Sequence, residues 1–138
     1  MKRLMFLLIA MLYASCNTAT SVEELAAIQG EWRLQRLQVG DGGGAVNVPI
    51  PARYTARFEP DGTVNFKVDC NRCSGSYTTD GNAITIGPLL ACTLAACPPG
   101  SLSGPYLQGL LSAQRYVRSG ATLVLSGSGT ELDFLVAD

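Results

Sequence analysis

Residues 54–68 read YTARFEPDGTVNFKV, and this stretch decides the fold. Apolar side chains occupy every second position on both sides of a turn, at Tyr54, Ala56, Phe58, Val64, Phe66 and Val68. A period of two places such a row of side chains on one face of a β-strand. Between the two rows, Pro60 presets the backbone angle φ and Gly62 accepts a positive φ. The stretch therefore predicts an antiparallel hairpin with one buried face and one polar face.

The same alternation recurs on both sides of this hairpin. It is found around Trp32 and Leu34, and again in residues 83–86, 122–125 and 132–135. Turns rich in glycine separate these segments at intervals of roughly ten residues, a spacing typical of a β-meander. We therefore expect a mainly antiparallel sheet built from short, sequential strands.

Two segments have helical signals instead. The run SVEE at residues 21–24 fits a capping box, which predicts a short helix from Ser21 to Ile28. After Pro105, leucines at positions 107, 110 and 111 recur at helical spacing, and this pattern predicts one amphipathic helix. Strands with a packed helix place the chain in the α+β class.

The composition excludes several classes of chemistry. The 138-residue chain has no histidine, so it cannot use Ser-His-Asp or Cys-His nucleophiles, a histidine base or a histidine zinc site. Its 47% apolar residues are typical of one folded domain rather than of a disordered chain. With 10 basic and 11 acidic residues, the chain lacks the positive charge that nucleic-acid binding requires.

The N-terminus has the pattern of an export signal. Lys2 and Arg3 precede an apolar run over residues 4–13, which is too short to span a membrane of roughly 30 Å. The run ends at Cys16 after small residues, similar to a bacterial lipobox with Tyr13 in the place of the usual leucine. We expect lipidation of Cys16; the alternative is ordinary signal cleavage after Ser21.

These expectations divide the chain into three parts. Residues 1–15 are the predicted lipoprotein signal peptide, residues 16–25 a lipid-anchored tether and residues 26–138 the folded domain. Removal of the signal peptide leaves 8 basic and 11 acidic residues, a net charge of −3.

The other cysteines are Cys70, Cys73, Cys92 and Cys97. An even set in an exported chain predicts two disulfides. The spacing also approaches that of a zinc ribbon, but the second pair encloses four residues instead of two, and exported thiols are usually oxidised. A redox Cys-x-x-Cys site normally lies at a helix N-terminus, whereas this one lies between predicted strands. Pairing of Cys70 with Cys73 would close a very small loop, and the other two connectivities stay open.

Several ordered motifs resemble the META domain, the HslJ-like family of bacterial envelope proteins. The most specific are Cys70-Asn71 followed by Gly75-Ser76-Tyr77, and Thr93-x-x-Ala96-Cys97. The resemblance implies a mainly antiparallel, strongly curved, barrel-like sheet with one packed helix, which together with the short N-terminal helix predicted above gives an α+β fold. It also implies an association with the envelope and with stress tolerance. It does not imply an established catalytic activity.

The resemblance also bears on individual positions. Cys70 and Cys97 occupy the family's own cysteine positions, which implies a Cys70–Cys97 disulfide and leaves Cys73 to pair with Cys92. Asp69 stands where the family usually has glycine, and Leu94 stands where it often has a basic residue.

The candidate recognition surface comprises Asp69, Asn71, Arg72 and Leu94, beside the predicted cross-links. We expect Asp69 and Arg72 to form an exposed ion pair. Asn71 is expected to bond local backbone and to adopt a left-handed turn. Asp61 and Asp80, each next to a glycine, are interpreted as turn formers.

The aromatic residues have two interpretations. They are Trp32, Tyr54, Phe58, Phe66, Tyr77, Tyr106 and Tyr116. They would fill the core of the domain, or they would line a pocket for an apolar ligand; the core is the simpler explanation.

Together these features predict a lipoprotein of the bacterial cell envelope with a non-catalytic binding or structural role, without metal or cofactor. It would face the periplasm, attached to the outer rather than the inner membrane through its lipid, with an envelope protein as partner and no nucleic acid. The alternative is a carrier or pilot protein that shelters a lipid or peptide. An enzyme of unknown type ranks third, because no nucleophile has an evident activating base.

Replacement of the predicted lipidation site tests the anchor. Cys16→Ser is expected to move the protein from the membrane fraction to the soluble fraction, measured by immunoblotting of fractionated cells. A wild-type protein that is already soluble, with Val22 as its mature N-terminus, would contradict the expectation.

Overall fold

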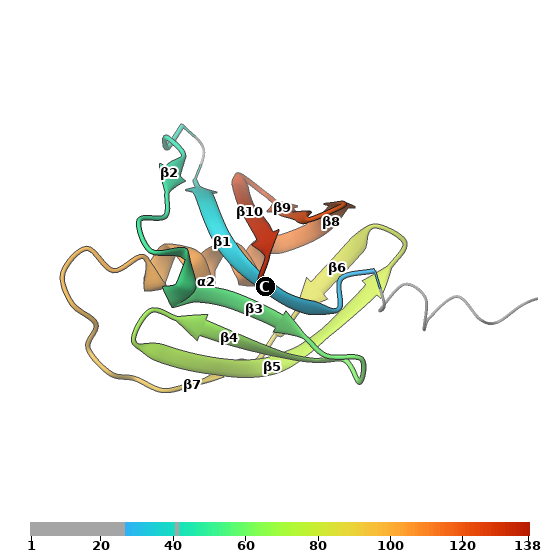
Figure 1. The fold of residues 1–138 in the computed structure, drawn as a ribbon, viewed down its shortest axis with the longest axis horizontal. Helices are drawn as coiled ribbons and strands as arrows, with labels where there is room; N and C mark the ends of the chain where they lie inside the picture. The colour runs from blue at the N-terminus through green and yellow to red at the C-terminus, as the bar shows by residue number, and fades with distance from the viewer. Residues whose placement is uncertain (1–26, 41) are drawn as a thin grey trace, which may run out of the picture.

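The computed structural model describes residues 27–40 and 42–138, and in this part eight strands form a closed antiparallel barrel with one helix (Figure 1). The strands of the barrel are β1 (Gly30–Val39), β3 (Tyr54–Phe58), β4 (Thr63–Val68), β5 (Asn71–Asp80), β6 (Ala83–Ile86), β8 (Ala113–Ser119), β9 (Thr122–Gly127) and β10 (Thr130–Val136). Each of these eight strands pairs with the next one in this order, and β10 pairs with β1 to complete the ring. The predicted antiparallel, curved sheet with one packed helix is therefore confirmed.

Three short elements lie outside the ring. The strand β2 (Val46–Asn47) pairs with β1, and β7 (Ala91–Cys92) extends the sheet along β5. A single 3₁₀ turn, η1 (Pro51–Arg53), leads into β3. The predicted helix at Ser21 to Ile28 lies outside the described residues, except for its last two positions, which form a turn.

The hairpin from which the prediction started has the expected turn. The Glu59 N–H donates to the Thr63 carbonyl at 2.9 Å, and Gly62 has a φ of +86°. The Asp61 carboxylate accepts hydrogen bonds from the Thr63 hydroxyl and the Thr63 N–H, which lowers the pKa of Asp61 below its usual value. Asp61 is thus a turn former, as predicted.

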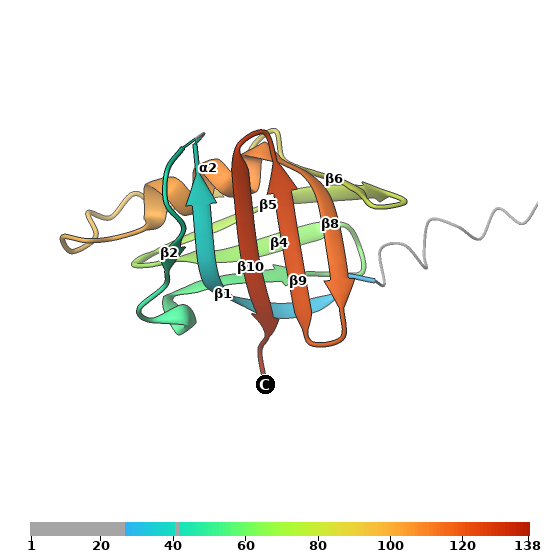
Figure 2. The same cartoon turned by 90° about the horizontal axis from the view of Figure 1, so that it is seen from above.

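Helix α2 (Ser103–Ser112) lies between strands from opposite parts of the barrel wall (Figure 2). It packs against β1, β9 and β10 and also against β4 and β6. Its Tyr106 is fully buried, with ring centroids 5.8 Å from Tyr54, 6.4 Å from Phe66 and 6.2 Å from Phe134. Burial raises the pKa of Tyr106 well above its usual range.

The core interpretation of the aromatic residues is confirmed, because all seven are buried. The buried face of α2 differs from the predicted one: Tyr106, Gly109 and Leu110 are buried, whereas Leu111 is 48% exposed. The helix is rotated toward its aromatic residue because Tyr106 offers more apolar surface to the barrel than a leucine does.

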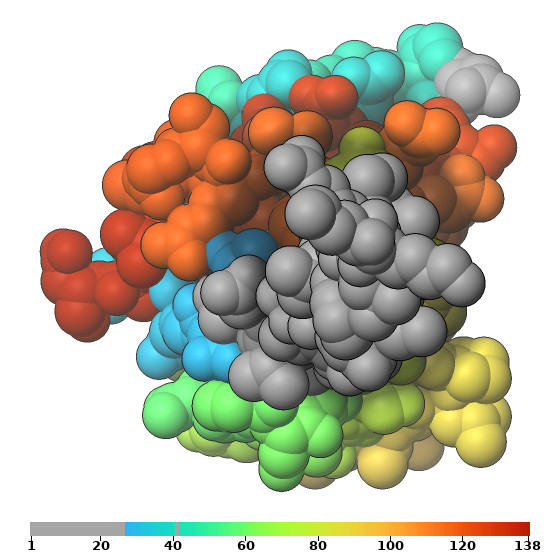
Figure 3. All heavy atoms as spheres, turned by 90° about the vertical axis from the view of Figure 1, so that its right-hand side faces the viewer, coloured from blue at the N-terminus to red at the C-terminus, as the bar shows by residue number. Residues whose placement is uncertain are grey.

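Among the described residues, the core extends from Ile28 to Phe134 and is made by the strands and helix of the barrel and the residues that join them. Figure 3 shows atoms from the N-terminal, middle and C-terminal thirds of the sequence, in blue, green to yellow and orange to red, side by side on one face of the molecule. In the part of the chain that the structure describes, no helix has the length and apolarity needed to cross a membrane.

Two glycines of α2 test how closely the helix packs. A Cβ atom at Gly109 would lie 2.8 Å from a methyl group of Leu132, whereas one at Gly104 would meet nothing within 4 Å. Gly109→Ala is expected to lower the free energy of unfolding by about 1 to 3 kcal/mol through overpacking. Gly104→Ala should leave it unchanged or raise it by up to about 1 kcal/mol. Urea unfolding measures the free energy of unfolding of both variants. Equal values for Gly109→Ala and Gly104→Ala would contradict the packing of α2 described here.

Candidate functional site

The predicted recognition residues lie at the hairpin between β4 and β5. Val68 and Asn71 are paired, so Asp69 and Cys70 form a two-residue turn. The strand β5 begins at Asn71, so the expectation that residues 70–73 separate two strands is wrong. Asp69 has a φ of +58°, a backbone conformation that glycine adopts freely and aspartate tolerates. This conformation fits the glycine that the family resemblance leads one to expect at this position.

Asp69 is buried rather than exposed. Its side chain is 6% exposed, and its carboxylate lies 3.8 Å from the Arg53 guanidinium. The Asp69 N–H donates to the Arg53 carbonyl at 2.8 Å. The predicted surface ion pair with Arg72 is therefore wrong, because the tight turn directs the Asp69 side chain toward η1. Asp69 belongs to the scaffold of the site and not to its exposed surface.

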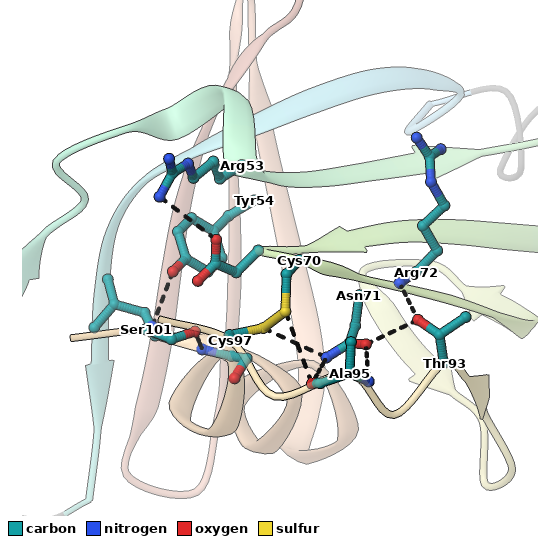
Figure 4. Close-up of a disulfide and its surroundings, with 12 residues drawn as sticks. Arg53, Tyr54, Cys70, Asn71, Arg72, Thr93, Ala95, Cys97 and Ser101 are labelled. Carbon is teal, nitrogen blue, oxygen red and sulfur yellow. Dashed lines mark hydrogen bonds and ion pairs between the residues drawn. A yellow bond between two sulfur atoms is a disulfide. The ribbon is translucent and has the colours of Figure 1, made fainter. Parts of the chain in front are cut away.

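Both disulfides are present, with the connectivity that the resemblance implied. Cys70 is bonded to Cys97 (Figure 4). Cys73 is bonded to Cys92 on the neighbouring strand β7. They close loops with sequence separations of 27 and 19 residues, for which loop-closure entropy gives about 2 to 4 kcal/mol of stabilisation each. Since all four thiols are bonded, none of them is free to bind zinc or to act as a redox nucleophile.

Asn71 fastens the segment after β7 to the start of β5. Its amide nitrogen donates to the Ala95 carbonyl at 2.9 Å, and its amide oxygen accepts from the Ala95 N–H at 2.8 Å and from the Thr93 hydroxyl at 2.9 Å (Figure 4). The expectation that Asn71 bonds local backbone in a left-handed turn is wrong. Its partners lie more than twenty residues away, so only the fold brings them together.

Residues 93–97 are thus a loop held at both ends. Asn71 binds it through Thr93 and Ala95, and the disulfide to Cys70 fixes it at Cys97. We call this arrangement the Asn71 clamp. Between these attachments, Leu94 is 94% exposed.

Arg72 completes the predicted set, with a side chain that extends away from the clamp (Figure 4). It lies on the outer face of the sheet, where it helps to line a groove with a volume of about 890 Å³. The other charged residues of this groove are Glu31, Arg33, Arg57, Glu59 and Lys67. Sequence analysis missed Arg33, Arg57 and Lys67, because alternation assigns them to the polar face but only the strand register shows that they are neighbours.

Four of the eight Asp and Glu side chains that the structure describes form ion pairs. Arg36 binds both Glu131 and Asp133, at 2.9 and 2.7 Å, and these contacts raise the pKa of Arg36. Arg57 binds Glu59 at 2.8 Å. Among the described residues, no three His, Cys, Asp or Glu side chains come together as a metal site would require.

The closed eight-stranded antiparallel barrel with one helix gives the chain a lipocalin-like barrel fold. Its sequence matches the META domain over residues 23–138, and the chain therefore belongs to the META domain family. The family resemblance seen in the Cys-Asn and Thr-x-x-Ala-Cys motifs is confirmed. No curated protein matches the sequence.

Solved structures with the same fold come from several bacteria. A Burkholderia xenovorans protein determined by NMR is 25% identical, with a TM-score of 0.68 over 83% of this chain and 87% of that one. A DUF4847 family protein from Bacteroides vulgatus is 16% identical, with a TM-score of 0.62 over 84% of this chain and 99% of that one. A lipocalin-like protein from Bacteroides uniformis is 19% identical, with a TM-score of 0.54 over 80% of this chain and 99% of that one.

The Asn71 clamp makes a testable contribution to stability. Asn71→Ala removes four side-chain hydrogen bonds, including a longer one to Cys97 Sγ, and leaves the Ala95 backbone groups without Asn71 as their partner. The free energy of unfolding should therefore fall by about 1 to 3 kcal/mol. Amide hydrogen exchange at Ala95 should accelerate while both disulfides stay intact. Asn65→Ala, on the exposed face of β4, is the matched control and should change neither quantity. An unchanged exchange rate at Ala95 in Asn71→Ala would show that the clamp does not hold the loop.

Proposed function

We propose that this protein is a lipid-anchored component of the bacterial cell envelope with a non-catalytic binding or structural role in stress tolerance. It binds its partner on the outer surface of the barrel, at the disulfide end of the sheet. The observation that carries this proposal is the Asn71 clamp, which holds an exposed loop in one conformation beside a charged groove. Loops that present side chains from a rigid scaffold are the usual site of recognition.

The packing of the barrel supports binding on its surface. Tyr106 lies inside the barrel in contact with the rings of Tyr54, Phe66 and Phe134. A carrier that shelters a lipid or a peptide needs an apolar cavity of about 300 Å³ or more. Aromatic side chains occupy the place where such a ligand would lie, which favours the surface over the interior.

The chemistry of the side chains supports a non-catalytic role. The sequence has no histidine, and the cysteines of the domain are bonded to one another. Asp69 is held by Arg53 beneath the turn, and Glu59 is held by Arg57. Nucleophilic catalysis needs a nucleophile next to an activating base, and these groups offer no such pair.

The cross-linked and closed barrel also suits the envelope. Disulfides form and persist in oxidising compartments, and they stabilise the native state by restricting the unfolded chain. Among the described strands, only the two-residue β2 and β7 lie outside the closed ring, so little sheet edge is left for aggregation during heat stress. The anchor at Cys16 would hold this stable body at the membrane.

Photo-crosslinking in cells tests the proposed function. A photoreactive amino acid replaces Leu94 in the clamp loop or, as a control, Val117 on β8, which is 61% exposed. We expect a discrete adduct with an envelope component, protein or lipid, at position 94 and none at position 117, measured by mass spectrometry of the purified protein. No adduct at position 94, with or without heat stress, or equal adducts at both positions would contradict the proposal.

A further inference from the structure

The groove on the outer face of the sheet contains a row of basic residues. Register places Arg33 opposite Thr55, Thr55 opposite Lys67, and Lys67 opposite Arg72. Since paired strands lie about 4.8 Å apart, the three basic residues span about 15 Å across four strands. The row therefore presents three positive charges to one side of the barrel.

The groove contains two carboxylates, Glu31 and Glu59, and four basic residues, so it keeps a net positive charge. The fourth basic residue of the groove, Arg57, is paired with Glu59. In residues 27–40 and 42–138, the side chains of Arg33, Lys67 and Arg72 form neither an ion pair nor a hydrogen bond. Like charges directly opposite each other on paired strands repel, which is the arrangement of Lys67 and Arg72. A bound anion would remove this repulsion.

Two exposed apolar side chains lie in the chain segment that borders the groove. Leu89 is 84% exposed and Leu94 is 94% exposed. They lie on either side of β7, in the segment that contributes Ala91 and Thr93 to the groove. Large aliphatic side chains beside a basic surface are typical of proteins that bind the interface of an anionic membrane.

The position of the groove along the chain fits a membrane as its partner. Glu31, the first residue of the chain in the groove, follows Cys16 by fifteen residues. A fully extended segment of this length reaches at most about 50 Å. An anchor at Cys16 would therefore keep the groove within reach of the lipid headgroups.

We propose that the groove docks on the membrane surface, where Arg33, Lys67 and Arg72 bind the phosphate groups of anionic lipids and Leu89 and Leu94 enter the interface. This inference deepens the proposed function, on which it rests, by naming the partner of the surface at the disulfide end. Guanidinium groups suit this role because they bind phosphate oxygens through two parallel hydrogen bonds.

Co-sedimentation with vesicles tests the inference. The chain beginning at residue 17 contains the whole barrel and its core but lacks the lipidation site and the apolar run. It is expected to bind vesicles of mixed phosphatidylglycerol and phosphatidylcholine, to bind vesicles of pure phosphatidylcholine much more weakly, and to be released by high salt.

Charge-neutralising variants show whether the groove is responsible. Lys67→Gln and Arg72→Gln should each weaken binding to the anionic vesicles by about fivefold, the usual contribution of one basic residue near such a surface. Arg115→Gln, on β8 across the barrel, is the matched control and should bind as the wild type does (Figure 1). The melting temperatures of the groove variants should stay unchanged or rise slightly, because a repulsion is removed.

Three results would overturn the inference. They are equal binding to both kinds of vesicle, unchanged binding of the Lys67→Gln, Arg72→Gln double variant, and saturable binding of inorganic phosphate as strong as that of the vesicles, which would identify a free anion as the ligand. The vesicle assay uses neither the lipid anchor nor a protein partner. A failure here is therefore distinct from a failure of the proposed function, which the cross-link at position 94 reports. A protein adduct at that position with no vesicle binding would uphold the proposed function alone.

Discussion

The structure depends on β1, the strand that closes the barrel. Its first residues pair with β3, its later residues pair with β10, and a register shift between Leu34 and Arg36 allows the strand to bend from one neighbour to the other. Trp32 belongs to both ladders, is fully buried, and donates its indole N–H to the Ile28 carbonyl at 2.9 Å. Because the ring is closed, its interior must be filled, and α2 fills it with Tyr106. The outer face is then left as the surface on which polar residues gather.

Much of the fold could be predicted from local pattern. Alternation places Val64, Phe66 and Val68 inside, and Pro60 with Gly62 identifies the turn, because each signal acts within a few residues. The rotation of α2 could not be predicted in this way. Leucine spacing favours Leu111, but the shape of the barrel interior selects Tyr106, and that shape is made by strands distant in sequence.

In the candidate site, too, some features could be predicted from the sequence and others depend on contacts between distant segments. The disulfide connectivity followed from the family resemblance, whereas the partners of Asn71 and the burial of Asp69 depend on how the β4–β5 turn meets η1 and the loop after β7. The row of Arg33, Lys67 and Arg72 was missed for a related reason. Each residue is an ordinary outward-facing position in its own strand, and only the register between four strands makes them neighbours. What joins fold to function is therefore long-range: the disulfides and the Asn71 clamp fix the loop, and strand pairing assembles the charge beside it.

The central claim is that recognition takes place on the outer surface at the disulfide end while the interior stays packed. Amide hydrogen exchange tests it most directly, measured on the lipidated protein in isolated membranes and on the chain beginning at residue 17 in solution. The account predicts that membranes slow exchange in the first half of β5, in β7 and in residues 93–97, and leave α2 unchanged. Slower exchange in α2 with no change in residues 93–97 would place the ligand inside the barrel and contradict the account.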